Sequence, residues 1–289
     1  MLTITGRGIM KPHIKRVELE LTNTCDLVCK LCYRQTHPEC VSGIKHRSKD
    51  EVIEQVKGYE NLQFITLAGP TSEPTLHPEL FDILRELIDM DLEISLFING
   101  GTHDENFYRK LAVIFRRAKG NIYFTVCGST QELHERYRVG SSLEKVIKHF
   151  KIVDKISDKA VMTWLIFNYN EDDFNKNKHM FDGYHTEYFY TLPIQEHFEL
   201  DSDIHLPEPL HSAYKEIDRT DTESRCTAEN YGFELISCDG TTNPCNLYKL
   251  YGKDRCFECT TKNAEFLRRH KIYHVCEPED EYSEDDLRL

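Results

Sequence analysis

The sequence predicts an α/β fold built around a parallel β-sheet. From residue 16 to about residue 200, six short β-rich runs alternate with stretches of helical periodicity. No internal repeat other than this strand–helix unit is present, and past Pro207 the alternation gives way to a cysteine-rich segment without long helices. Such repeats place the strands side by side with helices outside them, and ligands then collect at the carboxyl ends of the strands.

Each element can be assigned in chain order. The expected strands are Arg16–Thr22, Leu62–Ala68, Leu92–Ile98, Asn121–Val126, Lys159–Phe167 and Tyr188–Leu192. Between the second and third strands, Leu80, Ile83, Leu84, Leu87 and Ile88 recur at the offsets of one helix face. Pro78 suits the first turn of that helix. Periodicity leaves open whether the sheet stays flat or curls into a barrel.

Composition indicates a globular chain. Of 289 residues, 39% are hydrophobic and 29% charged, and no apolar run approaches the roughly 20 residues that span a bilayer. The segment MLTITGRGIMKPHIK lacks a signal-peptide core, so we expect a cytoplasmic location and no membrane partner. The net charge of −13 and the scattered basic residues disfavour binding to a long nucleic acid.

Three of the eleven cysteines form a compact motif, Cys25-x3-Cys29-x2-Cys32, directly after the first strand. Three thiolates can each bind one iron of a cubane cluster and leave the fourth iron for a chelating small molecule. A sulfonium compound held there can accept an electron, break its C–S bond and yield a carbon radical. A structural zinc loop that includes His37 or Cys40 is the alternative.

This loop is similar to that of the radical S-adenosylmethionine (SAM) superfamily, and the resemblance covers roughly residues 14 to 200. It implies a partial (β/α)6 TIM-type barrel, a [4Fe–4S] cluster on Cys25, Cys29 and Cys32, and bound SAM. Reductive cleavage of SAM to a 5′-deoxyadenosyl radical would be the reaction. A low-potential electron donor such as flavodoxin or ferredoxin is a further expected partner.

The same resemblance implies contacts to SAM from three loops and one strand. Thr71-Ser72-Glu73-Pro74 occupies the place of a GGEP-like turn, with both glycines replaced, and Glu73 can make a charge-assisted hydrogen bond to the SAM ammonium. Asn99 in FINGG and Thr125 on the fourth strand take the places of ribose contacts. Arg138 in HERYRVG takes that of the arginine that meets the SAM carboxylate.

Two positions depart from the family pattern. Leu31 stands where an aromatic residue is usual, and we expect it to pack on the adenine. Cys127 stands where many relatives carry aspartate. Its thiol faces the pocket or is buried and inert.

A second cysteine set lies near the carboxyl end: Cys226, Gly240-x4-Cys245 and Cys256-x2-Cys259. The Asp-Gly pair and the alternating residues after it predict a hairpin. The set resembles the twitch module, the shortened SPASM domain, which implies an auxiliary [4Fe–4S] cluster on Cys226, Cys245, Cys256 and Cys259. Zinc is the alternative metal, and Cys238 either replaces a ligand or is idle.

These assignments divide the chain into a radical SAM core (1–205), a twitch-like module (206–276) and an acidic tail (277–289). The substrate pocket is expected at the mouth of the barrel, where Glu196 and His197 are candidates for proton transfer. The first functional hypothesis is a radical SAM enzyme, an oxidoreductase or a lyase, acting on a small polar metabolite such as an aminosugar, amino acid or nucleoside. The second is a peptide maturase, with any leader-binding domain on a separate protein. The third is a non-catalytic iron–sulfur or zinc protein.

Overall fold

The computed structural model describes residues 14–36, 38–69, 71–190, 203–208 and 233–243. Its strands are β1 (Arg16–Leu19), β2 (Phe64–Leu67), β3 (Glu93–Ile98), β4 (Ile122–Val126), β5 (Ala160–Ile166), β6 (Thr186–Tyr190), β7 (Phe233–Ile236) and β8 (Thr242–Asn243). The α-helices are α1 (Tyr33–Thr36), α2 (Lys49–Lys57), α3 (Leu80–Asp89), α4 (Glu105–Phe115), α5 (Gln131–Tyr137), α6 (Leu143–Ser157) and α7 (Glu171–Asn177). Three short 3-10 helices complete the set: η1 (Pro38–Val41), η2 (Pro74–Leu76) and η3 (Lys178–Phe181).

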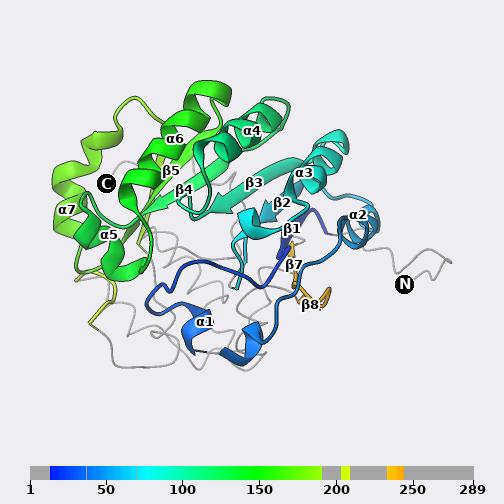
Figure 1. Cartoon of the computed structure of the whole chain (residues 1–289), viewed down its shortest axis with the longest axis horizontal. Coiled ribbons are helices and arrows are strands. Elements are labelled where there is room, and N and C mark those ends of the chain that lie inside the picture. Colours follow the sequence, from blue (N-terminus) through cyan, green and yellow to red (C-terminus); the bar gives the residue numbers. More distant parts are fainter. Residues whose placement is uncertain (1–13, 37, 70, 191–202, 209–232, 244–289) are drawn as a thin grey trace.

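The strands form one sheet in the order β6-β5-β4-β3-β2-β1-β7-β8. Every pair from β6 to β7 is parallel, so seven strands run in the same direction, and only β8 is antiparallel. Figure 1 shows α4 and α6 along one side of this sheet and the segment that carries α1 on the other. The α/β class predicted from the alternating pattern is confirmed. The first five expected strands are present with shorter bounds, and the sixth, expected at Tyr188–Leu192, begins two residues earlier, at Thr186.

Side chains alternate between the two faces of the sheet. On β1, Val17 and Leu19 belong to the hydrophobic core packed under the helices, so Glu18 between them faces the opposite side. On β5, Met162 and Trp164 join the same core. The helix-facing side is therefore apolar. The side of the α1 segment is mixed: Glu18 faces it, as do Phe97 and Tyr123, whose rings stack between β3 and β4.

Local capping decides where several helices begin. Ser48 and Glu51 form a capping box at the start of α2, and the side chains of Asp104 and Thr130 accept hydrogen bonds from the first turns of α4 and α5. Helix α3 begins at Leu80, so the prediction that Pro78 lies in its first turn is wrong. Residues 77–79 form a turn between η2 and α3 because Glu79, the N-cap, does not have helical backbone angles.

Strands β7 and β8 form the hairpin predicted around Gly240, which has a positive φ of 83°. The sequence placed these residues with the carboxyl-terminal module. The structure pairs β7 with β1 along four residues, from Arg16↔Phe233 to Leu19↔Ile236. Long-range pairing of this kind leaves no local signal in the sequence.

Among the described helices, none is both long and apolar enough to cross a membrane.

Candidate active site

The cysteine loop follows β1 and is fastened to the end of α5. The backbone N–H groups of Val28 and Lys30 donate to the carbonyls of Val139 and Tyr137, at 3.0 and 2.8 Å. Leu31 has a positive φ of 68°, which turns the chain sharply before Cys32. The loop therefore presents its three cysteines at the carboxyl end of the sheet, as the position of the motif after the first strand predicted.

Cys25, Cys29 and Cys32 form no disulfide within the described residues and are partly exposed. Burial raises the pKa of each thiol, and the three also influence one another electrostatically, so they lie close together. Among the described residues, no three His, Cys, Asp or Glu side chains converge as ligands of a single ion. A cubane cluster takes each thiolate on a different iron, so a spaced set of three soft donors fits it.

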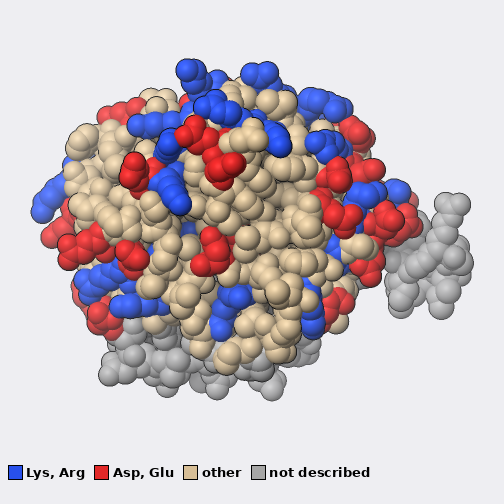
Figure 2. All heavy atoms as spheres, viewed as in Figure 1, with Lys and Arg blue, Asp and Glu red and all other residues tan. Residues whose placement is uncertain are grey.

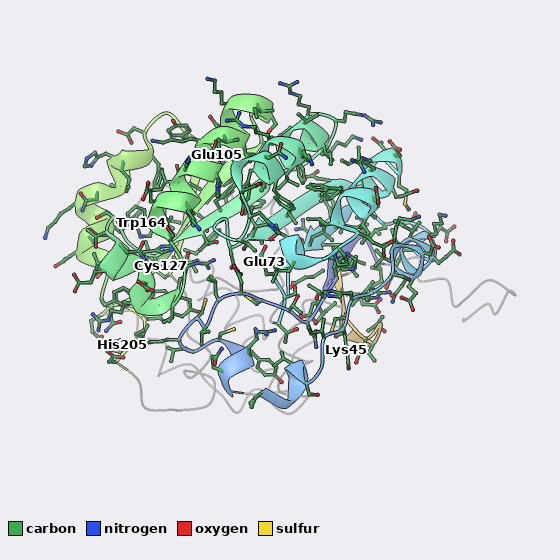
Figure 3. All side chains as sticks on the ribbon, in the orientation of Figure 1. Lys45, Glu73, Glu105, Cys127, Trp164 and His205 are labelled. Atoms are coloured by element: carbon green, nitrogen blue, oxygen red, sulfur yellow. The ribbon has the colours of Figure 1, made fainter. Side chains whose placement is uncertain are left out.

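Glu73 lies at the centre of the site, after the end of β2 and next to the cysteine loop (Figure 3). Its side chain is 1% exposed, and its carboxylate accepts hydrogen bonds from Thr75 N at 3.1 Å, from the Thr75 hydroxyl, and from Asn99 N at 2.7 Å. Burial raises its pKa to about 7, although these hydrogen bonds oppose the shift. Glu73 is thus a fixed inward carboxylate and not an exposed turn residue.

The turn before Glu73 holds its shape without the two family glycines. Thr71 donates from its N–H and its hydroxyl to Glu20 Oε1, at 3.0 and 2.7 Å, and neither Thr71 nor Ser72 has a positive φ. Gly69 does, at 128°, and a Cβ there would lie 2.1 Å from Glu20 Cγ. The position that requires glycine is therefore Gly69, two residues before Thr71, where the backbone passes close to Glu20.

Asn99 connects the three loops of the site. Its Nδ2 lies 3.3 Å from Cys25 Sγ and 2.9 Å from Asp26 Oδ1, and its Oδ1 accepts a 2.7 Å hydrogen bond from Arg138. Its backbone N–H donates to Glu73. All of these atoms come from segments distant in sequence that meet because parallel strands end at the same edge.

Arg138 is 7% exposed and stands directly after α5. Burial alone would lower its pKa, but the electrostatic interaction with nearby cysteines, that of Cys29 the largest, outweighs this effect and the pKa is raised. No described residue accepts a hydrogen bond from its Nε, which is buried. A buried guanidinium with an unused donor fits a carboxylate ligand.

His134 fixes the turn that carries Arg138. Its Nδ1 accepts a hydrogen bond from Cys127 N at 3.3 Å, so its Nε2 is the nitrogen that donates, to Ser141 Oγ at 2.8 Å. Burial lowers its pKa to about 3, so the ring is neutral. This histidine therefore has a structural role.

Leu31 packs against a small apolar cluster made of Cys127, Phe167 and Ile204. Cys127 is fully buried, and burial raises the pKa of its thiol to about 12, so it stays protonated and serves as packing. Figure 3 places it beside α5. Thr125 is half-buried on β4, two residues before Cys127, and faces the same side of the sheet.

Two residues of the site, Glu20 and Arg34, were not predicted from the sequence. Arg34 donates to the carbonyl oxygens of Thr71, at 2.6 Å, and Asn23, and so ties the cysteine loop to the Glu73 turn. Glu20 belongs to the alternating charged and apolar residues of the first strand, where nothing distinguished it from Glu18. Nothing in the sequence distinguished Arg34 from a surface arginine.

Several predicted site residues lie outside the described part of the chain. They are Glu196, His197, Cys226, Cys245, Cys256 and Cys259. Cys238 lies within it, in the turn between β7 and β8, and is partly exposed.

Figure 2 shows acidic and basic side chains interspersed over the visible face, with no continuous basic area.

Comparisons with known proteins identify the class. A family model described as the radical SAM superfamily matches residues 19–180, more than half of the chain, and the chain belongs to this superfamily. Membership of this superfamily implies a [4Fe–4S] cluster and bound SAM. It also indicates that the protein is an enzyme, and the type of reaction is open.

Individual relatives are distant. The tungsten-containing aldehyde ferredoxin oxidoreductase cofactor-modifying protein of Pyrococcus furiosus is 24% identical over 99 residues, which are 34% of this chain and 28% of that protein. SuiB of Streptococcus suis bound to S-adenosylmethionine superposes with a TM-score of 0.58 at 12% identity, over 83% of this chain and 61% of SuiB. SuiB bound to the precursor peptide SuiA gives 0.54 at 11% identity, over 85% and 63%. The chain thus spans less than two thirds of each relative, and at these identities the superposition shows the fold.

Proposed function

We propose that this protein cleaves SAM reductively and uses the resulting 5′-deoxyadenosyl radical to abstract hydrogen from a small polar metabolite. The observation that carries the proposal is the contact network around Asn99. This network joins a cluster-loop cysteine, a buried carboxylate and a buried guanidinium at one edge of the sheet. When bound, the [4Fe–4S] cluster on Cys25, Cys29 and Cys32 supplies the electron that splits SAM into methionine and the radical.

The chain's own residues would orient SAM. Arg138, with its unused Nε donor, is the partner for the SAM carboxylate. Glu73 is the acceptor for the SAM amino group, because its buried carboxylate faces the same loop as Cys25. Leu31 and the apolar cluster around Cys127 suit an adenine ring, and Thr125 suits the ribose. Two opposite charges on a rigid edge hold both ends of the amino-acid moiety of SAM and fix the position of its sulfonium.

Side chains on the face of the sheet opposite the helices favour the proposal of a polar substrate. Thr125, Thr163 and Glu187 are neighbours in register across β4, β5 and β6. Thr163 is 3% exposed, and its hydroxyl has no hydrogen-bond partner in the described ranges. Hydroxyl and carboxylate groups in a row match an aminosugar, an amino acid or a nucleoside better than an apolar compound.

An auxiliary [4Fe–4S] cluster on Cys226, Cys245, Cys256 and Cys259 forms part of the proposal. It would accept or return the electron of a substrate radical. Metal analysis of anaerobically prepared protein tests it, because two clusters require about eight irons per chain. About four irons with one zinc would make the carboxyl-terminal module structural and remove the electron-transfer role.

SAM cleavage tests the core of the proposal. We expect dithionite-reduced wild-type protein to form 5′-deoxyadenosine and methionine from SAM, and Cys29→Ala to lose this activity together with about four irons. Cys127→Ala removes a buried thiol outside the loop and should retain the iron. An iron-loaded wild type that forms no 5′-deoxyadenosine would favour the non-catalytic alternative.

The class of substrate can be identified from the compound that gives its hydrogen to the 5′-deoxyadenosyl radical. With deuterated small metabolites, deuterium in 5′-deoxyadenosine would identify the compound attacked and support the proposal. Deuterium that enters only from a peptide that carries a leader sequence would establish a peptide maturase instead.

A further inference from the structure

The side-chain amide of Asn99 has an orientation that chemistry fixes. Arg138 can only donate, so the atom 2.7 Å from its Nη2 must be the amide oxygen. The amide nitrogen then points the other way, to Cys25 Sγ at 3.3 Å and Asp26 Oδ1 at 2.9 Å. An amide nitrogen carries two protons, so both acceptors can be served at once.

This orientation gives Asn99 a role that differs from a ribose contact. Its oxygen and both of its amide protons are already engaged by protein groups. The backbone N–H is held by Glu73 and keeps the residue in place. The group that the side chain serves most directly is the sulfur of a cluster ligand.

We propose that Asn99 is a positioning residue that sets the reduction potential of the cluster by donating a hydrogen bond to Cys25 Sγ. The inference rests on the proposed function. Hydrogen bonds to ligand sulfurs are among the factors that set iron–sulfur potentials. Reduction adds negative charge to the cluster and its thiolates, so an N–H donor favours the reduced form and raises the potential.

Arg138 strengthens this donor. A guanidinium bound to the amide oxygen polarises the amide and makes its N–H groups better donors. The residue proposed to bind the SAM carboxylate is therefore one hydrogen bond away from the residue that contacts the cluster ligand. Binding of SAM to Arg138 would change the strength of the Asn99–Cys25 contact and connect SAM occupancy to the potential.

A redox titration followed by electron paramagnetic resonance, on SAM-free anaerobic holoenzyme, tests the inference without measuring activity. The thiolate accepts this bond in both oxidation states, so the potential responds only to the difference in bond strength between them. The full strength of a hydrogen bond to a charged acceptor, roughly tenfold in an equilibrium constant, sets the upper limit. We therefore expect Asn99→Ala to lower the potential by up to about 59 mV for this one-electron couple. Iron content and circular dichroism equal to wild type would show that the variant is folded and loaded.

Asp26 provides the matched control, because Asn99 also holds its charge near the cluster. Asp26→Ala removes that charge, and Asn99→Ala in the Asp26→Ala background should still lower the potential by a similar amount. An unchanged potential in Asn99→Ala, or a shift that disappears in the double variant, overturns this inference. Neither result would count against the proposed cleavage of SAM. A wild type without a cluster removes the proposed function and this inference together.

Discussion

Replacing Glu73 by glutamine isolates the effect of burying one carboxyl group. Burial raises the pKa of Glu73 from 4.5 to about 7. Between those two values the folded state binds more protons than the unfolded state. The contribution of Glu73 to stability is therefore complete below pH 4.5 and is lost as pH rises through 7. Integrated from about pH 5 to about pH 8, the loss is about 2.5 kcal/mol.

The assay is urea unfolding of cluster-free protein at four values between about pH 5 and about pH 8. The glutamine side chain does not titrate, so the unfolding free energy of wild type minus that of Glu73→Gln should fall by about 2.5 kcal/mol over this range. At any one pH the variant also loses an acceptor for Asn99 or Thr75, which shifts the whole curve by a constant. Glu60→Gln, on an exposed bend, is the control and should run parallel to wild type. Parallel curves for wild type and Glu73→Gln would refute the reasoning, because Glu73 would then have the same pKa in both states.

Two further variants test the supports of the site. Arg138→Lys keeps a charge but lacks the planar guanidinium that can contact Asn99 and a carboxylate together. We therefore expect the affinity of the holoenzyme for SAM, measured by equilibrium dialysis, to fall at least about tenfold. An affinity equal to that of wild type would show that Arg138 does not bind SAM. Glu20→Ala leaves the N–H and hydroxyl of Thr71 without their acceptor, so we expect the cluster-free protein to lose about 1–3 kcal/mol of unfolding free energy in urea. A loss no greater than that of Glu60→Ala would contradict this role.

Much of the site could be predicted because its chemistry is local. The three cysteines occur within one short stretch, and the strand before them is a short β-rich run. Glu73, Asn99 and Arg138 each follow a recognisable element, and the structure brings them together with Cys25. Their roles toward SAM remain predictions, as do those of Glu196, His197 and the four carboxyl-terminal cysteines.

Other features depend on contacts that no local pattern encodes. The alternating residues near Gly240 predicted a hairpin, but only tertiary pairing decided that β7 lies beside β1. Both glycines of the family pattern are replaced in the turn before Glu73, and Glu20 and Gly69 provide its shape from outside the motif.

The sequence by itself determined the α/β class, the cluster loop and the residue types of the site, because periodicity and cysteine spacing are local properties of the chain. Tertiary structure decided how those residues act. Burial moves the pKa of Glu73 to about 7, and the meeting of strand ends makes Asn99 a donor to Cys25. Desolvation and hydrogen-bond geometry depend on groups far apart in sequence, so they exist only once the chain has folded.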